Sequence, residues 1–194
     1  PRNDTTLWPE SCTVKVDRLG AVTALIVTSS SGQGHQTLTA TVIGEALGID
    51  PTKIRVIHSD SLSSLPGNSP VASRMAIMLG GAAKKAAEIV RDRVIRVAAH
   101  NLGLSPEAVV YNDGTVSAAD DPSKSLTWDQ IVRICHRQNH LMPPDMEPGL
   151  QASYTLQVPK GGTMPTEDGR VQMYPCFSFE AHMAFVEIDP GTGK

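Results

Sequence analysis

The sequence predicts an α+β fold in which mixed β-sheets pack against helices. Segments rich in β-branched residues, such as "AVTALIV" at 21–27, alternate with segments whose apolar residues recur at helical spacing. Gly, Pro, Asn and Asp stand between these segments, as expected for turns. No repeat or low-complexity linker divides the 194 residues. We therefore treat 1–194 as one domain or part of one, with subdomains 1–103 and 104–194 as the alternative.

Composition excludes several classes of protein. Hydrophobic residues make up 40%, charged residues 19%, and the net charge is −3, which argues against disorder and against a nucleic-acid partner. No apolar run reaches the roughly 18 residues of a membrane span, and no signal peptide is recognised, so we expect a cytoplasmic protein. Cys12, Cys135 and Cys176 are too few and too scattered for a disulfide framework or a four-thiolate site. Because the chain begins at Pro1 and stops after "IDPGTGK", we expect it to be a piece of something longer.

The first third of the chain reads as a hairpin, a helix and a strand. "CTVKV" at 12–16 and "AVTALIV" flank the turn "DRLG" and predict two paired strands. From Gln36 onward the apolar spacing is helical, and Gly48 is placed to end that helix. "KIRVIH" at 53–58 predicts a further strand.

A long Ala-rich helix is predicted from Val71 to about His100. Ser69 and Pro70 have the form of an N-cap followed by a first-turn proline. Gly80 and Gly81 lower helix propensity, which is explained most simply by close packing against a neighbouring element. The expected buried stripe consists of Met75, Leu79, Ala82, Ala86, Ile89 or Val90, Val94 and Val97.

The second half predicts a hairpin, a short helix and two strands. "AVVYNDGTVSA" at 108–118 contains an Asn-Asp-Gly turn typical of hairpins. Thr127 with Gln130 forms a capping box for a helix through Arg137. "LQASYTLQV" at 150–158 and "FSFEAHMAFVEI" at 177–188 read as strands.

Two polar, glycine-containing loops end where a helix is predicted to start, which is the arrangement of an anion-binding site. Helix N-termini offer unpaired N–H groups, and glycines let a ligand approach the backbone. In the first loop, Gly32, Gln33 and Gly34 supply backbone donors, and Gln33, His35 and Thr37 supply side chains.

The second loop contributes the other set of candidate ligand-binding residues. Asn68, Ser69 and Ser73 offer polar groups for phosphate or sugar oxygens, and Arg74 adds a guanidinium suited to phosphate. Neither loop matches the P-loop or the dinucleotide-binding fingerprint, so an ordinary nucleotide fold is disfavoured.

Plainer interpretations stand beside these. A Gly-Gln-Gly turn before a helix is often only a turn, and Ser-Pro is often only a cap. His136 and His140 have the i, i+4 spacing of a metal pair, but no third ligand is evident, and we interpret them as surface histidines. No Ser-His-Asp or paired-carboxylate arrangement is found. The sequence therefore gives no catalytic residue and no metal ligand.

An ordered set of motifs resembles the xanthine oxidase family of molybdenum hydroxylases. The motifs are "GQGHQT" at 32–37, "ALGIDPTKIRVIHSDS" at 46–61, "PGNSPVASR" at 66–74, "GGAAKKAA" at 80–87 and "AHMAFVEIDPGTG" at 181–193. Their order is that of the large, cofactor-binding subunit of xanthine dehydrogenases, aldehyde oxidoreductases and carbon monoxide dehydrogenases. Ser31 and Ala72 depart from the family pattern, which frequently has an acidic or methionine-bearing approach and a glycine at these places.

The resemblance implies a ligand for both loops. Gly32, Gln33, Gly34, His35 and Thr37 correspond to the segment that contacts molybdopterin, and Ser73 and Arg74, with Asn68 and Ser69 beside them, to the segment that holds its phosphate, often extended by a cytidine nucleotide. It also implies oxidative hydroxylation of a small substrate with oxygen from water. The family's catalytic glutamate has no match here, so this chain alone is expected to be inactive, with 2Fe-2S clusters and FAD on partner domains or subunits.

Two other functions stay open from the residues alone. One is a non-catalytic module that binds phosphate or an ordinary nucleotide. The other is a structural or assembly subunit that retains the fold without the ligand.

Overall fold

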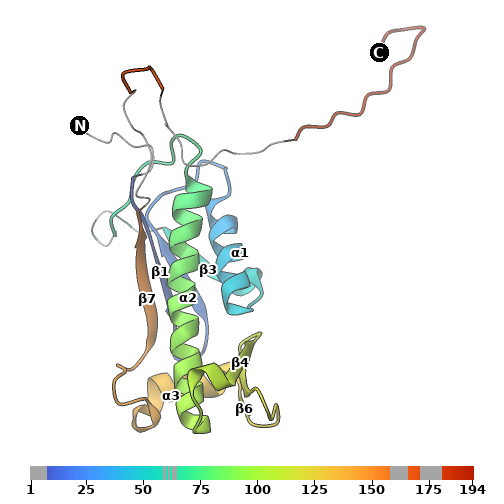
Figure 1. Cartoon of the computed structure of the whole chain (residues 1–194). Coiled ribbons are helices and arrows are strands. Elements are labelled where there is room, and N and C mark those ends of the chain that lie inside the picture. Colours follow the sequence, from blue (N-terminus) through green and yellow to red (C-terminus); the bar gives the residue numbers. More distant parts are fainter. Residues whose placement is uncertain (1–7, 59, 61, 63–64, 158–165, 171–180) are drawn as a thin grey trace.

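The computed structural model describes residues 8–58, 60, 62, 65–157, 166–170 and 181–194. Within them the chain forms a four-stranded sheet in the order β3-β2-β1-β7, a three-stranded sheet in the order β4-β5-β6, and the helices α1, α2 and α3 (Figure 1). The predicted α+β class, with mixed sheets packed against helices, is confirmed. The division at residue 104 stays a prediction, and β7 from the second half pairs with β1 from the first.

The four-stranded sheet is built on the predicted hairpin. β1 (Glu10–Val16) and β2 (Val22–Ile26) are antiparallel, and the Asp17 carboxylate holds their turn by accepting from the Leu19 and Ala21 amides at 2.8 and 3.0 Å. β7 (Leu150–Leu156) pairs antiparallel with β1, and β3 (Arg55–His58) runs parallel to β2. β3 and β7 confirm two more predicted strands.

Two helices cover one face of this sheet (Figure 1). α1 (His35–Leu47) connects β2 to β3 by way of the 3₁₀ turn η1 (Pro51–Lys53), and α2 (Met75–Leu102) runs along β1 and β7. Gly48 ends α1 in the left-handed conformation, as predicted. The predicted stripe of α2 is buried, with Val90 rather than the 39% exposed Ile89 in the core.

The start of α2 was predicted wrongly. The helix begins at Met75, not after the Ser69-Pro70 pair, and its N-cap is Arg74. Ala72 and Ser73 both have positive φ, 58° and 52°, so the chain turns sharply before it can enter the helix. An N-cap residue followed by proline indicates only a local preference for a helix start. Here contacts with the sheet override that preference.

The second sheet and α3 lie at the end of α2 far from its start (Figure 1). After the 3₁₀ turn η2 (Pro106–Ala108), β4 (Val109–Asn112) and β5 (Thr115–Ala118) form the predicted Asn-Asp-Gly hairpin, and β6 (Ser125–Leu126) completes the sheet. α3 (Trp128–Arg137) starts with the predicted capping box and is followed by the 3₁₀ turn η3 (Asn139–Leu141).

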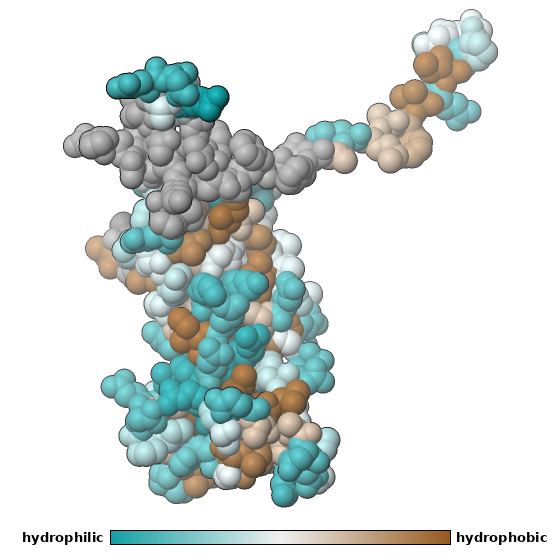
Figure 2. Space-filling model, in the orientation of Figure 1, coloured by the Kyte–Doolittle hydropathy of each residue, from teal (hydrophilic) through white to brown (hydrophobic). Residues whose placement is uncertain are grey.

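The strand expected over 177–188 is not found in its described part. Residues 177–180 lie outside the described residues, and 181–188 form no strand. This segment extends away from the sheets, with the side chains of Met183, Phe185, Val186 and Ile188 between 64% and 90% exposed (Figure 2). A β-like sequence forms a strand only where a neighbouring strand supplies hydrogen-bond partners, and no strand of the described residues lies beside it.

No helix among the described residues combines the length and apolar character that a membrane crossing requires.

Replacement by alanine should change the free energy of unfolding in opposite directions at two helix glycines. An added Cβ at Gly80 would lie 3.7 Å from Leu38 Cδ1, an ordinary contact, whereas at Gly44 it would lie 2.6 Å from the backbone oxygen of Ile49. We expect Gly80→Ala to raise the free energy of unfolding by about 0.5 to 1 kcal/mol and Gly44→Ala to lower it by about 1 to 3 kcal/mol. Urea denaturation measures both, and effects of the same sign would contradict the packing described for these helices.

The buried thiol of Cys12 should make stability fall at alkaline pH. Burial raises its pKa from 9.0 to about 12. Between these values the unfolded chain loses a proton that the folded chain keeps, so stability present below pH 9 declines by about 1.4 kcal/mol per pH unit. Urea denaturation from pH 8 to 11 should show a steeper decline for the wild type than for Cys12→Ala. Parallel curves would contradict this origin.

Candidate functional site

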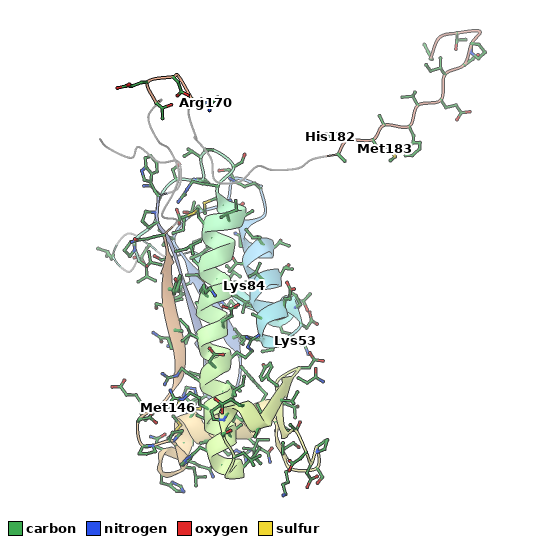
Figure 3. All side chains as sticks on the ribbon, viewed as in Figure 1. Lys53, Lys84, Met146, Arg170, His182 and Met183 are labelled. Carbon is green, nitrogen blue, oxygen red and sulfur yellow. The ribbon has the colours of Figure 1, made fainter. Side chains whose placement is uncertain are left out.

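Both predicted ligand-binding loops lie at the same end of the four-stranded sheet. Here β2 and β3 end, β1 begins, and α1 and α2 have their N-termini (Figure 1). α3 and Met146 lie at the opposite end of the molecule (Figure 3). Two helix N-termini therefore direct their unpaired N–H groups and positive dipole ends toward one region.

The first loop is held by its own polar groups. Gln33 Oε1 accepts from the Ser31 amide at 2.5 Å and from Ser30 Oγ at 3.2 Å, and the Gly34 amide donates to Ser30 Oγ at 3.1 Å. Gly32 and Gly34 have positive φ, 107° and 75°. The Gln33 side-chain oxygen thus accepts hydrogen bonds within the turn. The NH₂ group of the same side chain makes no hydrogen bond with the described residues.

The glycines leave open space beside the backbone. A Cβ added at Gly32 or Gly34 would meet no heavy atom within 4 Å. His35, the first residue of α1, is only 3% exposed, and its Nδ1 atom has no hydrogen-bond partner in the part of the chain that the structure describes. A buried polar atom without a partner costs free energy, so its occurrence beside a bare backbone is the behaviour expected of a ligand-binding surface. A polar cofactor fits these residues.

Sequence reasoning missed a link between this loop and β3. Gln36 Nε2 lies 2.5 Å from His58 Nε2, and His58 Nδ1 lies 3.2 Å from the Thr28 carbonyl oxygen. His58 therefore connects the end of β3 to α1 and to the residue before the first loop. Its polar position at the end of an apolar strand was the available indication.

The second loop enters α2 through the left-handed residues Ala72 and Ser73. Two consecutive non-glycine residues with positive φ are uncommon and cost free energy, and such conformations occur frequently at functional sites. Ser73 is exposed, as are Asn68 and Ser69. These polar groups and the first turn of α2 form the part of this loop that a ligand can reach.

Arg74 points away from that surface. Its side chain is buried, and Nη1 forms an ion pair with Glu10 Oε1 at 2.7 Å and donates to the Ser69 carbonyl oxygen at 2.8 Å. Nη2 donates to the Trp8 carbonyl oxygen, and Nε has no partner among the described residues. The charge of Arg74 is therefore already matched by Glu10, and its predicted phosphate contact stays a prediction.

Glu10 and its neighbours fasten the second loop to the sheet. Besides Arg74, Glu10 accepts from the Asn68 amide at 2.7 Å and from Thr28 Oγ1 at 3.1 Å. Thr28 Oγ1 lies 2.6 Å from the Asn68 carbonyl oxygen, and Ser11 Oγ donates to the Pro66 carbonyl oxygen at 2.5 Å. Glu10 was missed, although its place in the strand put it on the same face as core residues, where a carboxylate requires a partner.

The structure brings together most of the predicted site residues. Thr37 is the exception, because it is exposed on α1 and faces a different pocket. That pocket has a volume of about 330 Å³ and is also lined by Pro51 and Thr52. The others gather at the loop end: Gly32, Gln33, Gly34, His35, Asn68, Ser69, Ser73 and Arg74.

The two histidines at metal-pair spacing are not on one helix. α3 ends at Arg137, so His136 is helical and His140 belongs to η3. His136 is half-buried rather than on the surface, and its buried Nε2 atom has no hydrogen-bond partner within the described ranges. Among the described residues, no group of three or more His, Cys, Asp or Glu side chains has the geometry to hold a metal ion.

Comparison with known proteins identifies the family. A family model described as "Molybdopterin cofactor-binding domain" matches residues 2–194. The chain is 30% identical over 97% of its length to the nicotine 6-hydroxylase large subunit of Paenarthrobacter nicotinovorans, and 36% identical over 93% to subunit gamma of the 6-hydroxypseudooxynicotine dehydrogenase complex of the same organism. It covers 21% of each relative.

A solved structure agrees with this assignment. Quinoline 2-oxidoreductase from Pseudomonas putida 86 superposes with a TM-score of 0.70 and 32% identity, over 76% of this chain and 19% of that one. The chain belongs to the molybdopterin cofactor-binding domain family, within the molybdenum hydroxylases. The resemblance to the xanthine oxidase family is confirmed, and the chain spans about a fifth of the length of the curated relatives it matches.

Substitution of Gly67 should test how closely the second loop lies against the sheet. An added Cβ would lie 2.7 Å from Val27 Cβ and 2.9 Å from Glu10 Oε2. We expect Gly67→Ala to lower the free energy of unfolding by about 1 to 3 kcal/mol, because the loop must move away from β1 and β2. Val71→Ala, at a 45% exposed position of the same loop, should change it by less than about 0.5 kcal/mol. Equal effects in urea denaturation would contradict the close contact.

Proposed function

We propose that the loop end of this domain binds molybdopterin as part of a molybdenum hydroxylase that oxidatively hydroxylates a small substrate. The observation that carries the proposal is the meeting of both loops at the N-termini of α1 and α2, beside the buried Nδ1 of His35, which has no partner among the residues described. The arrangement suits a flat, polar, anionic ligand that takes its hydrogen bonds from the backbone.

The first loop is proposed to hold the pterin part. Gly32 and Gly34 let the ligand approach the backbone, and the Gln33 amide and the His35 ring supply side-chain hydrogen bonds. Thr37 belongs to the same proposal as the least direct contact, because it lies on the exposed side of α1.

The second loop is proposed to hold the phosphate. Asn68, Ser69 and Ser73 offer exposed polar groups beside the positive end of α2, and Arg74 stands directly behind them. A cytosine dinucleotide form of the cofactor is part of this proposal, because the additional phosphate and sugar oxygens match a second polar loop.

When bound, the cofactor supplies the molybdenum redox chemistry with which an oxygen from water is introduced into the substrate. The residues described here bind and orient it, and none of them is proposed as a catalytic base. The base, the 2Fe-2S clusters and FAD are proposed to lie on other segments or subunits, and this chain alone is proposed to be inactive. Two relatives are a large subunit and a subunit of a complex, which supports such partners.

A cytoplasmic location completes the proposal. Cys12 and Cys135 are free thiols in the core, which fits a reducing compartment.

Cofactor content is the direct test. The protein is isolated with its co-purifying chains, molybdenum is measured by elemental mass spectrometry, and oxidative release is used to detect a fluorescent pterin and CMP. Molybdenum and pterin in near-equal amounts are expected, with CMP if the cofactor is the dinucleotide. Their absence from an assembly that contains the complete large polypeptide would contradict the proposal and favour a structural subunit. An ordinary nucleotide in their place would favour a nucleotide-binding module.

Substitution of Gln33 tests the first loop. Gln33→Ala removes both the NH₂ group proposed to bind the ligand and the oxygen that holds the turn, and we expect cofactor retention during dialysis to fall at least about fivefold to tenfold. Lys84→Ala, an exposed change on α2 (Figure 3), is the control and should retain the cofactor as the wild type does. Equal retention in both variants would remove Gln33 from the site.

A further inference from the structure

We infer that Glu10 is the positioning residue of this site, that it holds the second loop at a fixed place relative to the first, and that Arg74 acts through Glu10 rather than as a direct ligand. The inference rests on the proposed function for the identity of the ligand. The positions of the two loops themselves do not depend on it. Glu10 lies on β1, outside both loops.

The first step is the set of contacts made by the Glu10 carboxylate. Oε1 accepts from Arg74 Nη1 and from the Asn68 backbone amide, each at 2.7 Å, and Oε2 accepts from Thr28 Oγ1 at 3.1 Å. The side chains of Glu10 and Arg74 are both 0% exposed. One buried carboxylate thus joins the start of α2, the middle of the second loop and the end of β2.

The second step is that the Arg74 guanidinium is not free. Its Nη1 and Nη2 atoms donate to Glu10, to the Ser69 carbonyl oxygen and to the Trp8 carbonyl oxygen. A phosphate on the exposed side of the loop would have to break this buried pair to reach the charge, which leaves a carboxylate buried without its partner. Ser73 is exposed and can meet a ligand without any such change.

The third step connects Glu10 to the first loop. Thr28 immediately precedes that loop, and its hydroxyl lies within hydrogen-bond distance of both Glu10 Oε2 and the Asn68 carbonyl oxygen. The Thr28 carbonyl oxygen contacts His58, whose other ring nitrogen meets Gln36 on α1. A continuous series of contacts therefore runs from the start of α2 to the start of α1.

The fourth step separates positioning from stability. A buried ion pair is on average no more stabilising than apolar side chains of similar volume, so the core alone does not require one here. What apolar side chains lack is directional hydrogen bonding. Of the contacts made by Glu10 and Arg74, three are with backbone atoms, namely Asn68 N, Ser69 O and Trp8 O. The pair is therefore used to fix main-chain positions.

The test compares Glu10→Gln with a control that weakens the same sheet elsewhere. Both variants are made in the full polypeptide with its co-purifying chains. Leu150→Ala is the control, because Leu150 is 1% exposed and pairs with Val16 at the other end of β1. We expect Glu10→Gln to lower molybdenum and pterin per polypeptide about tenfold, the effect typical of residues that orient ligands. Leu150→Ala should retain the cofactor even at an equal loss of thermal stability. Cofactor loss proportional to the loss of stability in both variants would overturn the inference.

A double variant separates a positioning role from a merely structural one. Glu10→Leu with Arg74→Met removes both charges and keeps apolar volume, so thermal stability should recover relative to Glu10→Gln. Cofactor content should stay low, because the loop backbone has lost its hydrogen bonds. Recovery of both thermal stability and cofactor content in the double variant would show that Glu10 has only a structural role. Full cofactor retention in Glu10→Gln with loss in Arg74→Gln would instead make Arg74 a direct ligand and overturn the inference.

Hydrogen exchange keeps the inference testable apart from the proposed function. In Glu10→Gln the Asn68 amide should exchange at least about tenfold faster, while amides at the centre of β1 exchange as in the wild type. If the wild type contains no molybdenum or pterin, the proposed function fails, and faster exchange at Asn68 still supports the positioning role. Unchanged exchange at Asn68 would overturn it whatever the ligand is.

Discussion

The buried ion pair between Glu10 and Arg74 is the interaction on which the arrangement of this domain's functional end depends. Both side chains are removed from water, so each charge can exist there only because the other is 2.7 Å away. The pair joins residues 64 positions apart and fixes where β1 begins, where the second loop passes and where α2 starts. If either charge is removed alone, the remaining one keeps its other hydrogen bonds but is buried without a counter-charge.

This constraint bears on the proposed binding of an anion. Because Arg74 is paired with Glu10, the proposal assigns the attraction of an anion to backbone N–H groups and the dipoles of α1 and α2. Such groups are fixed by the fold and need no reorganisation when a ligand binds. Directional hydrogen bonds from the backbone also distinguish a phosphate or a pterin edge by shape, which a flexible charged side chain does less well.

The rest of the fold supports this end. In the four-stranded sheet, β2 and β3 end beside the start of β1. The small sheet and α3 lie at the far end of α2, which is 28 residues long. The alanines and glycines of α2 let it approach β1 and β7 closely, and Gly81 faces Leu156 directly. No further helix or strand of the described residues lies over the loop end.

Local sequence determined the hairpin around Asp17, the end of α1 at Gly48, the capping box of α3 and the polar character of both loops, because each depends on residues within one turn of one another. The resemblance of the ordered motifs to the xanthine oxidase family added the ligand that these patterns could not name. Only the tertiary structure decided that α2 starts at Met75, that Arg74 faces inward to Glu10, and that 181–188 form no strand. Each of these depends on a partner far away in the sequence, and local preferences carry no information about where that partner lies.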